Sequence, residues 1–284
     1  MAVVGESITL DTAAFDLLWE RLALGAFPLV LQLRSQGDTF DERHELLDVA
    51  RARLHEDGLL DGTDVQPRLA AWLQVLARPE DEVDVRWRDG TEQLRATVAR
   101  RGDSTVRVLR SGEELTLTPV TPGSMPAAAV DVLPDVPAAT SGGQISAPTE
   151  QLSSAYTAAA VSMHAGTEAL LALGAERTDA LALATALVTT AAVSQIGAAT
   201  TVGGRRVRHP SVVAVVDTGR GRYLSTERAG AGPSPVVNGA AGHDGQPGAG
   251  CHRAPRRGAG RCGQDVGRHR ATPVSSAPTG SGIG

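Results

Sequence analysis

Lysine is absent from this 284-residue sequence, so all 27 of its permanently cationic side chains are arginine. We interpret this usage as a GC-rich coding bias rather than a functional requirement. Positive charge is also scarce in most of the chain. Residues 230–284 carry six arginines and two aspartates, a net +4, so the total of −5 leaves −9 for residues 1–229. An acidic body of this kind argues against binding to nucleic acid or to an anionic membrane.

Cysteine is nearly absent too, because the two that occur, Cys251 and Cys262, lie near the C-terminal end. No disulfide framework is therefore expected in the preceding residues. The first ten residues have no cationic run followed by an apolar stretch, so we expect no secretory signal. The most apolar segment, residues 180–199, is interrupted by threonines, Ser194 and Gln195, so we expect no membrane insertion. These absences predict a soluble, cytoplasmic protein.

What the sequence does contain is an alternation of helical and strand periodicities over residues 7–118. Asp11 or Thr12 is expected to cap a first helix, and Thr39 with Glu42 fits a capping box before a second. Later, apolar and polar residues alternate on both sides of turns such as Asp89-Gly90, which predicts a four-stranded antiparallel meander. The expected elements are a strand at 7–10, a helix from 11 or 12, a strand at 27–33, helices at 39–58 and 67–79, and the meander at 83–117.

After residue 118 the composition changes. Residues 119–148 are rich in proline, alanine and glycine and are expected to form a linker. Two alanine-rich helices should follow at 149–173 and 178–193, with short strands at 195–202 and 211–217. The sequence thus predicts an α/β (α+β) fold, in which a central antiparallel sheet carries helical bundles. The expected body is residues 1–229, with an N-terminal half at 1–118 and a second half at 149–229.

Residues 230–284 differ from everything before them. They include 14 glycines and 6 prolines but no leucine and no aromatic residue. Such a segment cannot bury enough apolar surface to offset its ordering entropy, so we expect it to be disordered. Its composition is also what an out-of-frame reading of GC-rich DNA produces. Resequencing the gene would test this frameshift hypothesis.

One short motif is similar to a catalytic loop. Apolar residues 212–216 precede Asp217-Thr218-Gly219, as in the active-site loop of aspartic proteases. That chemistry needs two carboxylates that share one proton, from two lobes or from a homodimer. The motif occurs once here, and Arg220 stands where such enzymes usually have a small residue. A turn after a buried strand is the simpler interpretation, and a dimeric aspartyl-protease-like enzyme that uses Asp217 is the alternative.

No other pattern indicates catalysis. The sequence contains no G-x-S-x-G, P-loop or H-E-x-x-H motif. Cys251, His252, Cys262 and His269 are potential zinc ligands, but their spacing matches no common finger, so we expect no metal and no cofactor. We therefore expect a protein that binds rather than an enzyme.

Short segments in a consistent order carry a resemblance to a known family. They include Ile8-Thr9-Leu10-Asp11, Leu18-Trp19-Glu20, Phe27-Pro28-Leu29, Trp72-Leu73, Val83-Asp84-Val85-Arg86-Trp87, Gln195-Ile196-Gly197-Ala198 and Gly221-Arg222-Tyr223-Leu224. Over residues 6–226 the chain resembles the EspG proteins of actinobacterial type VII (ESX) secretion. The resemblance implies a quasi-two-fold α/β architecture and a cytosolic chaperone that binds the helical tip of PE/PPE-type clients. It also implies a further C-terminal helix, which the composition of residues 230–284 does not predict.

A chaperone of this kind needs an apolar patch with a polar rim. We predict this patch on the second-half sheet around residues 194–201, with the arginines of residues 205–208 as its rim, although a solvated loop is the alternative for those arginines. The predicted partner-binding residues are Ser194, Gln195, Ile196, Thr200, Arg205, Arg206 and Arg208. A decayed, non-functional product of an EspG-like gene is a further alternative to the chaperone.

Overall fold

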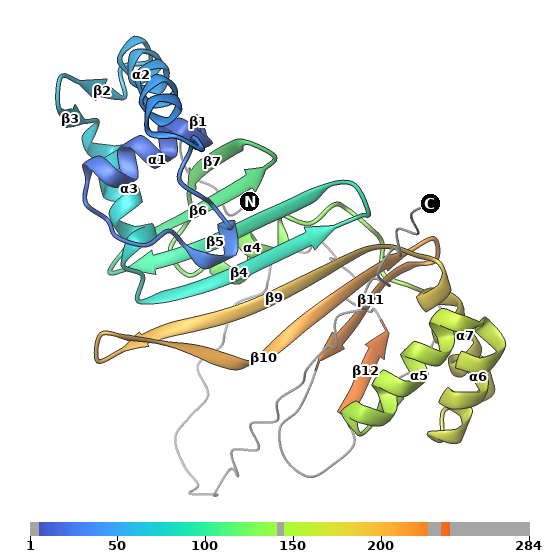
Figure 1. Cartoon of the computed structure of the whole chain (residues 1–284). Helices are drawn as coiled ribbons and strands as arrows, with labels where there is room; N and C mark the ends of the chain where they lie inside the picture. The colour runs from blue at the N-terminus through green and yellow to red at the C-terminus, as the bar shows by residue number, and fades with distance from the viewer. Residues whose placement is uncertain (1–5, 141–144, 227–233, 239–284) are drawn as a thin grey trace, which may run out of the picture. The chain divides into compact units, whose positions relative to one another are not determined.

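The computed structural model describes residues 6–140, 145–226 and 234–238 (Figure 1). Its contacts divide the chain into two compact units. Unit 1 comprises Met1–Asp135 and Ala191–Val216, and unit 2 comprises Val136–Thr190 and Asp217–Gly284. The predicted second half, residues 149–229, is therefore shared between the two units.

Unit 1 is built on antiparallel strands. In chain order its elements are β1 (Ile8–Asp11), α1 (Thr12–Arg21), the 3-10 helix η1 (Leu29–Leu31), α2 (Phe40–Glu56), β2 (Leu60–Asp61), β3 (Asp64–Val65), α3 (Pro67–Ala77), β4 (Asp81–Arg88), β5 (Gln93–Arg101), β6 (Ser104–Ser111), β7 (Glu114–Pro119), α4 (Met125–Val130), β9 (Thr190–Val202) and β10 (Arg205–Thr218). Seven of these strands lie in the order β1-β7-β6-β5-β4-β9-β10, while β2 and β3 form a separate ribbon. The predicted meander is confirmed as β4 to β7.

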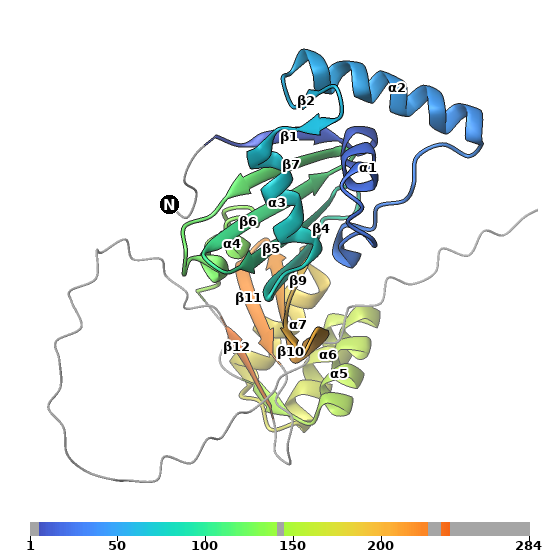
Figure 2. The ribbon, with the colours of Figure 1, turned by 90° about the vertical axis from the view of Figure 1, so that its left-hand side faces the viewer.

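The two faces of this sheet carry different helices. Leu115 and Leu117 of β7 and Val108 of β6 pack with α1 and α3, so we name this side the α1/α3 face. Figure 2 shows α1 and α3 lying across the strands. On the opposite side, Arg107 of β6 donates to the backbone oxygen of Ala128 in α4, which defines the α4 face. Because side chains alternate along a strand, each residue of the sheet belongs to one of these faces.

Aromatic side chains form the centre of the unit 1 core. Phe15 and Trp19 stack with ring centroids 5.2 Å apart, and Phe27 lies 5.6 Å from Trp19. Helix α1 begins where predicted, because the side chain of Asp11 accepts a hydrogen bond from the backbone N–H of Ala14. The cap at Thr39 is also confirmed, since its side chain accepts from the N–H of Glu42.

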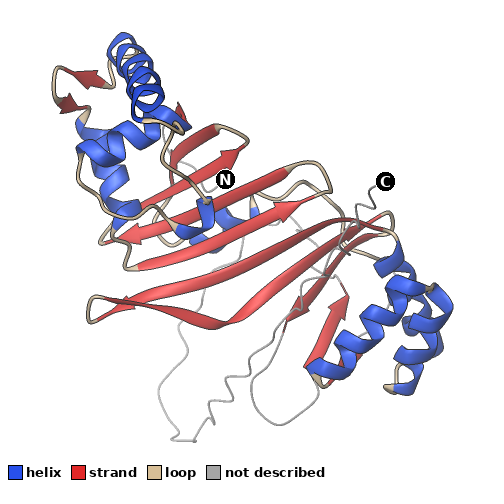
Figure 3. Ribbon diagram, in the orientation of Figure 1, coloured by secondary structure: helices blue, strands red, loops and turns tan. Residues whose placement is uncertain are grey.

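Unit 2 combines short strands with three helices among its described residues. Its elements are β8 (Ile145–Ala147), α5 (Thr149–Val161), α6 (Met163–Ala172), α7 (Arg177–Val188), β11 (Gly221–Thr226) and β12 (Ser234–Asn238). The strands lie in the order β11-β12-β8 and pair antiparallel. Figure 3 shows the three helices packed together, with α6 in contact with both α5 and α7.

Several expected elements differ from the structure. The strand predicted at 27–33 is wrong: η1 occupies this segment, and Gln32 at its end has a φ of 48°, which ends any extended run. The single helix predicted at 149–173 is broken at Ser162, whose hydroxyl caps α6 by accepting from the N–H of Ala165. The helix predicted to reach residue 193 ends at Val188, and β9 begins at Thr190.

Ordered elements also extend into segments expected to be irregular. The predicted linker at 119–148 contains α4 and β8. The strands expected at 195–202 and 211–217 are the longer β9 and β10, so residues 205–210 belong to a strand and not to a loop. The disorder predicted from residue 230 does not hold for Ser234–Asn238, which forms β12. The remaining tail, including Cys251 and Cys262, lies outside the described residues.

Candidate partner-binding surface

The predicted binding residues lie on one long hairpin of unit 1. Strands β9 and β10 are joined at Gly203 and Gly204, whose φ angles are 57° and 75°. Two consecutive residues with positive φ form the type of turn whose twist matches a hairpin, and glycine adopts them without strain. The sequence Gly203-Gly204 therefore allows both strands to run to the tip, and Figure 3 shows this hairpin as two long arrows.

The alternation of side chains divides the predicted residues between the two faces of the sheet. Ser194 and Ile196 lie opposite Trp87 and Val85 of β4, on the α4 face, and Thr200 shares their parity. Gln195 lies on the α1/α3 face. Ser194 is fully buried, so its side chain is not part of any surface.

The arginines divide in the same way. Arg206 and Arg208 reach the α1/α3 face, where both contact Asp84 at 3.3 Å. Arg205, one residue from Arg206, points to the opposite side by the same alternation. The seven predicted residues therefore do not form one continuous patch, although Gln195, Arg206 and Arg208 share a face.

Arg206 and Arg208 form an ion-pair cluster with two poorly exposed carboxylates of β4. Arg206 pairs with Glu82 as well as with Asp84, and the side chains of these acids are only 12% and 7% exposed. Burial raises the pKa of Glu82, and the nearby charge of Asp84 adds to this effect, against the opposing influence of Arg206. The cluster thus fixes the end of the hairpin against β4, because loss of Arg206 would leave the poorly exposed Glu82 without this partner, whereas Asp84 would keep Arg208.

Gly197 opens the path by which Arg208 reaches Asp84. It lies directly opposite Asp84 in the β4–β9 register. A Cβ atom at this position would stand 2.5 Å from Nη2 of Arg208. The absence of a side chain at Gly197 therefore lets the guanidinium lie across β9.

Threonine side chains tie the same end of β9 to the start of β4. Oγ1 of Thr200 donates to Oδ1 of Asp81 at 2.8 Å, and Oγ1 of Thr201 donates to the backbone oxygen of Pro79 at 2.7 Å. Asp81 also pairs with Arg100. The hydrogen bonds from Arg100 and then from Thr200 lower the pKa of Asp81. The exposed Thr200 thus has a local structural role.

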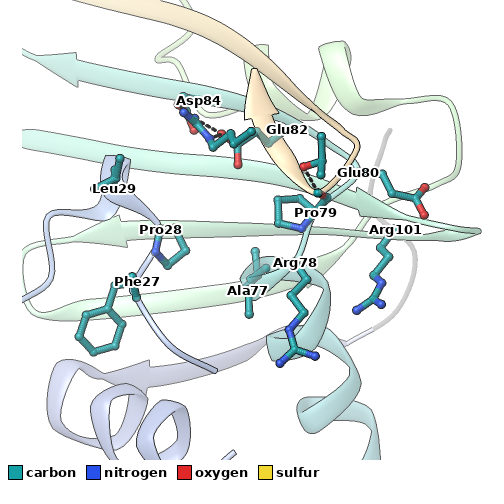
Figure 4. Close-up of a pocket in the computed structure, with 15 residues that line it drawn as sticks. Phe27, Pro28, Leu29, Ala77, Arg78, Pro79, Glu80, Glu82, Asp84 and Arg101 are labelled. Atoms are coloured by element: carbon teal, nitrogen blue, oxygen red, sulfur yellow. Dashed lines mark hydrogen bonds and ion pairs between the residues drawn. The ribbon is translucent and has the colours of Figure 1, made fainter. Parts of the chain in front are cut away.

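A pocket of about 620 Å³ opens beside this hairpin end. Its lining comes from three distant segments, namely residues 26–29, residues 76–80 with Glu82, Asp84 and Arg101, and the hairpin residues Thr201, Gly204 and Arg206. Figure 4 shows Phe27, Pro28 and Leu29 on one side of the pocket and the carboxylates from β4 on another. One wall is therefore apolar and the other charged.

Two arginines hold the apolar wall on the sheet. Nη1 of Arg110 donates to the backbone oxygens of Leu31 and Gln32 at 2.8 Å and 3.0 Å. Arg95 makes a longer contact, of 3.4 Å, with the oxygen of Val30. These bonds satisfy the carbonyls at the end of η1 and leave Leu29 at 77% exposure beside the pocket.

Sequence reasoning found the hairpin half of this surface and missed the other half. The sequence predicts a strand at 27–33, and nothing local links residues 26–29 to residues 201–206. One signal was available. Glu82 and Asp84 have a spacing of two along β4, as do Arg206 and Arg208 along β10, so each pair lies on one face of its strand. Opposite charges with the same spacing indicate that these two faces lie on the same side of the sheet, here across β9.

Comparison with known proteins decides the family. The model of the EspG family matches residues 11–246, which is most of the chain and extends past the boundary expected at residue 229. The chain belongs to the EspG family. The curated relatives of this EspG chain include the ESX-1 secretion-associated protein EspG1 of Mycobacterium tuberculosis, 34% identical over 124 residues, and the ESX-3 secretion-associated protein EspG3 of Mycolicibacterium smegmatis, 30% identical over 114 residues.

These matches are partial. The EspG1 match covers 42% of this EspG chain and 43% of the relative, and the EspG3 match covers 39% of each, so the aligned segment spans less than half of the curated relatives. The fold match is wider. A solved structure of the Mycobacterium tuberculosis type VII secretion system chaperone EspG5, in complex with a PE25–PPE41 dimer, aligns with a TM-score of 0.69 at 21% identity, over 82% of this chain and 91% of that one. The predicted mixed α/β fold with an antiparallel sheet is thereby confirmed.

Asp217, the candidate protease residue, is in a different environment in unit 2. Nε and Nη2 of Arg222 donate to its two carboxylate oxygens at 2.6 Å and 2.9 Å. The side chain of Asp217 is 6% exposed. Because a guanidinium engages both oxygens, this carboxylate is held as half of a structural ion pair and is not placed to share a proton with a second acid.

Among the residues that the structure describes, no helix is both long enough and apolar enough to cross a membrane. Within the same residues, no cluster of three or more histidine, cysteine, aspartate or glutamate side chains could hold a metal ion. The four potential zinc ligands of the tail lie outside this part of the chain.

Proposed function

We propose that this chain is a cytoplasmic chaperone of type VII secretion, which binds PE/PPE-type helical clients and acts by binding and not by catalysis. The observation that carries the proposal is its membership of the EspG family, together with the fold shared with EspG5, whose solved structure contains a PE25–PPE41 dimer. The ion pair of Asp217 with Arg222 supports the non-catalytic part.

The pocket of unit 1 supports a specific contact surface. Clients that expose apolar helical tips need a partner with an apolar patch, and a polar rim then sets specificity. Leu29 and Phe27 supply the apolar wall, and Arg206 with Arg101 and Arg78 supplies cations beside it. Of the residues predicted from the sequence, the proposal retains Gln195, Arg206 and Arg208 for this face, and Ile196, Thr200 and Arg205 for the α4 face. Ser194 is left out because it is buried.

Co-expression with a PE–PPE pair tests the proposal. The clients should remain soluble and co-purify with the chain, and Leu29→Asp should weaken the complex by about tenfold or more, as expected for one central apolar contact. Phe40→Asp is the matched control, because Phe40 is 94% exposed but lies on α2, away from the pocket lining. Failure of every PE–PPE pair to co-purify would remove the proposed function, whereas equal effects of the two variants would remove only the assignment of the pocket.

The adjacent arginines distinguish the two faces of the hairpin. Arg205→Gln and Arg206→Gln remove the same charge at neighbouring positions that point in opposite directions. Because Arg206 also pairs with Glu82 and Asp84, thermal melting first establishes that its variant is as stable as the Arg205 variant. Weaker client binding by a stable Arg206 variant alone would then place the client on the α1/α3 face, and weaker binding by the Arg205 variant alone would place it on the α4 face. Isothermal titration calorimetry of each variant gives the comparison.

A further inference from the structure

Helix α2 is the most exposed helix of unit 1 and has no role in the pocket. Only Ala50 and Leu54 are buried along its 17 residues. Those two residues form the side that faces the unit, and α2 packs there against α1. Figure 2 shows one end of α2 extending beyond the strands. Most of its surface is therefore open to contact.

Four residues form a narrow stripe along one exposed flank of α2. Glu42, Leu46, Val49 and Arg53 follow each other at spacings of four, three and four residues. At 3.6 residues per turn, these positions fall within an arc of about 60°. Leu46 and Val49 are 39% and 53% exposed, and the side chain of Arg53 is 65% exposed. Single exposed apolar residues are ordinary on protein surfaces, but these two are adjacent on one stripe and flanked by opposite charges.

The stripe is complementary to itself in one orientation. If a second copy lies antiparallel, Glu42 of each copy faces Arg53 of the other, and Leu46 faces Val49. A parallel copy would instead place Glu42 against Glu42 and Arg53 against Arg53, which repel. Isologous contacts about a two-fold axis require this kind of self-complementary surface.

Neighbouring residues do not oppose the antiparallel arrangement. On the outer flank of the stripe, Glu45 lies opposite Ala52 across the axis. On the inner flank, Ala50 is buried against its own unit and Arg43 pairs with Asp16 and Glu20 of its own chain, so no two like charges face each other. Arg53 contacts Asp11 within its own chain at 3.1 Å, in an exposed pair that can exchange partners at little cost. The spacing of four and three residues is also the spacing with which two helices pack along a seam.

We propose that this chain forms a homodimer through antiparallel contact of its α2 helices along Glu42, Leu46, Val49 and Arg53. The contact is about 17 Å long, from the helical rise over the eleven residue steps between Glu42 and Arg53. Because one helix pair buries less surface than a standard interface, the dissociation constant should lie between about 10 μM and 1 mM. The dimer does not depend on the client proposed above, so the two proposals can fail separately.

Charge exchange between two variants of the full chain tests this dimer. In sedimentation equilibrium the unmodified chain should show a monomer–dimer equilibrium. Glu42→Arg alone and Arg53→Glu alone place like charges opposite each other at both ends of the contact, so each should weaken association by about tenfold or more. An equimolar mixture of the two variants should restore it. In the mixed dimer the introduced arginine of one chain meets the introduced glutamate of the other, and the native pair of Glu42 with Arg53 forms at the second end.

Three measurements keep the test decisive. Arg51→Glu is the matched control, because Arg51 is two residues from Arg53 but on another side of the helix, and it should leave association unchanged. Circular dichroism melting of each variant establishes that it is folded. If Arg53→Glu is unstable because it stands near Asp11, Val49→Glu replaces it and should also abolish the dimer. A chain that stays monomeric at about 1 mM, or two variants that do not recover on mixing, would overturn the proposal.

Discussion

The two units achieve packing in opposite ways. Unit 1 fills its core with large side chains, since Phe15, Leu18 and Trp19 are each no more than 2% exposed. In unit 2 half of the buried core residues among the helices and β8 are alanine, and leucines such as Leu170 and Leu183 supply the remaining bulk. Large side chains stabilise by the apolar area they remove from water, whereas small ones let backbones approach closely.

The close approach in unit 2 can be located. A Cβ atom at Gly166 of α6 would lie 2.4 Å from the Cβ of Ala159 in α5. Gly221 similarly has a φ of 113° and would place a Cβ atom 2.8 Å from the backbone of Ala139. Unit 2 thus depends on positions where no side chain fits, and unit 1 depends on side chains that cannot be shortened. Shortening a large side chain should therefore cost most in unit 1, and enlarging a small one should cost most in unit 2.

The largest effect is expected from shortening the aromatic core of unit 1. Phe15 is fully buried and stacks on Trp19 at 5.2 Å. Phe15→Ala should lower the free energy of unfolding by about 3–5 kcal/mol, through lost burial and the cavity that remains. Urea denaturation followed by tryptophan fluorescence measures this, because Trp19, Trp72 and Trp87 all belong to unit 1.

Leu170→Ala in unit 2 is the companion to that experiment. Leu170 is also fully buried, and both tyrosines, Tyr156 and Tyr223, belong to unit 2. The substitution should alter the transition seen by circular dichroism and leave the tryptophan transition in place. If instead both substitutions shift the tryptophan transition equally, the two units unfold together. Their difference in packing would then not give them separate stabilities.

A second contrast is that the stability of unit 2 should fall at alkaline pH because of a buried tyrosine. Burial raises the pKa of Tyr156 to about 12, against the lowering effect of its hydrogen bond with Ser225. A phenol with a raised pKa in the folded state contributes stability below its unfolded pKa of about 10, and this contribution is lost as the pH rises through the folded value. Unit 2 should therefore lose about 1–2 kcal/mol between pH 10 and pH 12.

Tyr156→Phe tests this directly. The variant has no ionisable group at this position, so the part of the alkaline destabilisation that Tyr156 causes should disappear. Unfolding followed by circular dichroism at pH 8, 10 and 11 compares the two proteins. An identical pH dependence in both would show that burial does not hold this phenol neutral.

The sequence predicted elements wherever a local signal determines the structure. The caps at Asp11 and Thr39 and the turn at Asp89-Gly90 each combine a residue type with a fixed spacing, and each is present. The segment at 27–33 lacked such a signal. Its conformation depends on Arg110, which is about eighty residues away in the chain and satisfies the carbonyls at the end of η1.

The candidate surface was harder to predict for the same reason. Residues 194–208 are contiguous in sequence, but the period of two in a strand sends alternate side chains to opposite faces. The pocket beside them also needs residues 26–29 and 76–80, and their proximity is set by the sheet order and not by any local pattern. The one sequence signal for the long-range contact between β10 and β4 was the matching spacing of their charged residues.

The smallest expected changes in stability come from substituting one glycine in each unit. They compare directly how well each unit tolerates an added methyl group. At Gly166 the obstructing atoms are the Cβ and backbone of Ala159, so Gly166→Ala must push α5 and α6 apart. We expect a loss of about 1–2 kcal/mol, because overpacking exceeds the gain in helix propensity of about 1 kcal/mol.

At Gly197 of unit 1 the obstructing atom is Nη2 of Arg208, the mobile end of a long side chain that can move aside. Gly197→Ala should therefore change stability by less than about 0.5 kcal/mol, since alanine also reduces the entropy of the unfolded chain. Its effect should instead be local, through separation of Arg208 from Asp84. Thermal melting of both variants compares them, and a greater loss for Gly197→Ala than for Gly166→Ala would reverse the contrast. In that case the ion-pair cluster at the hairpin, and not the close helix contact of unit 2, would be the less tolerant of the two sites.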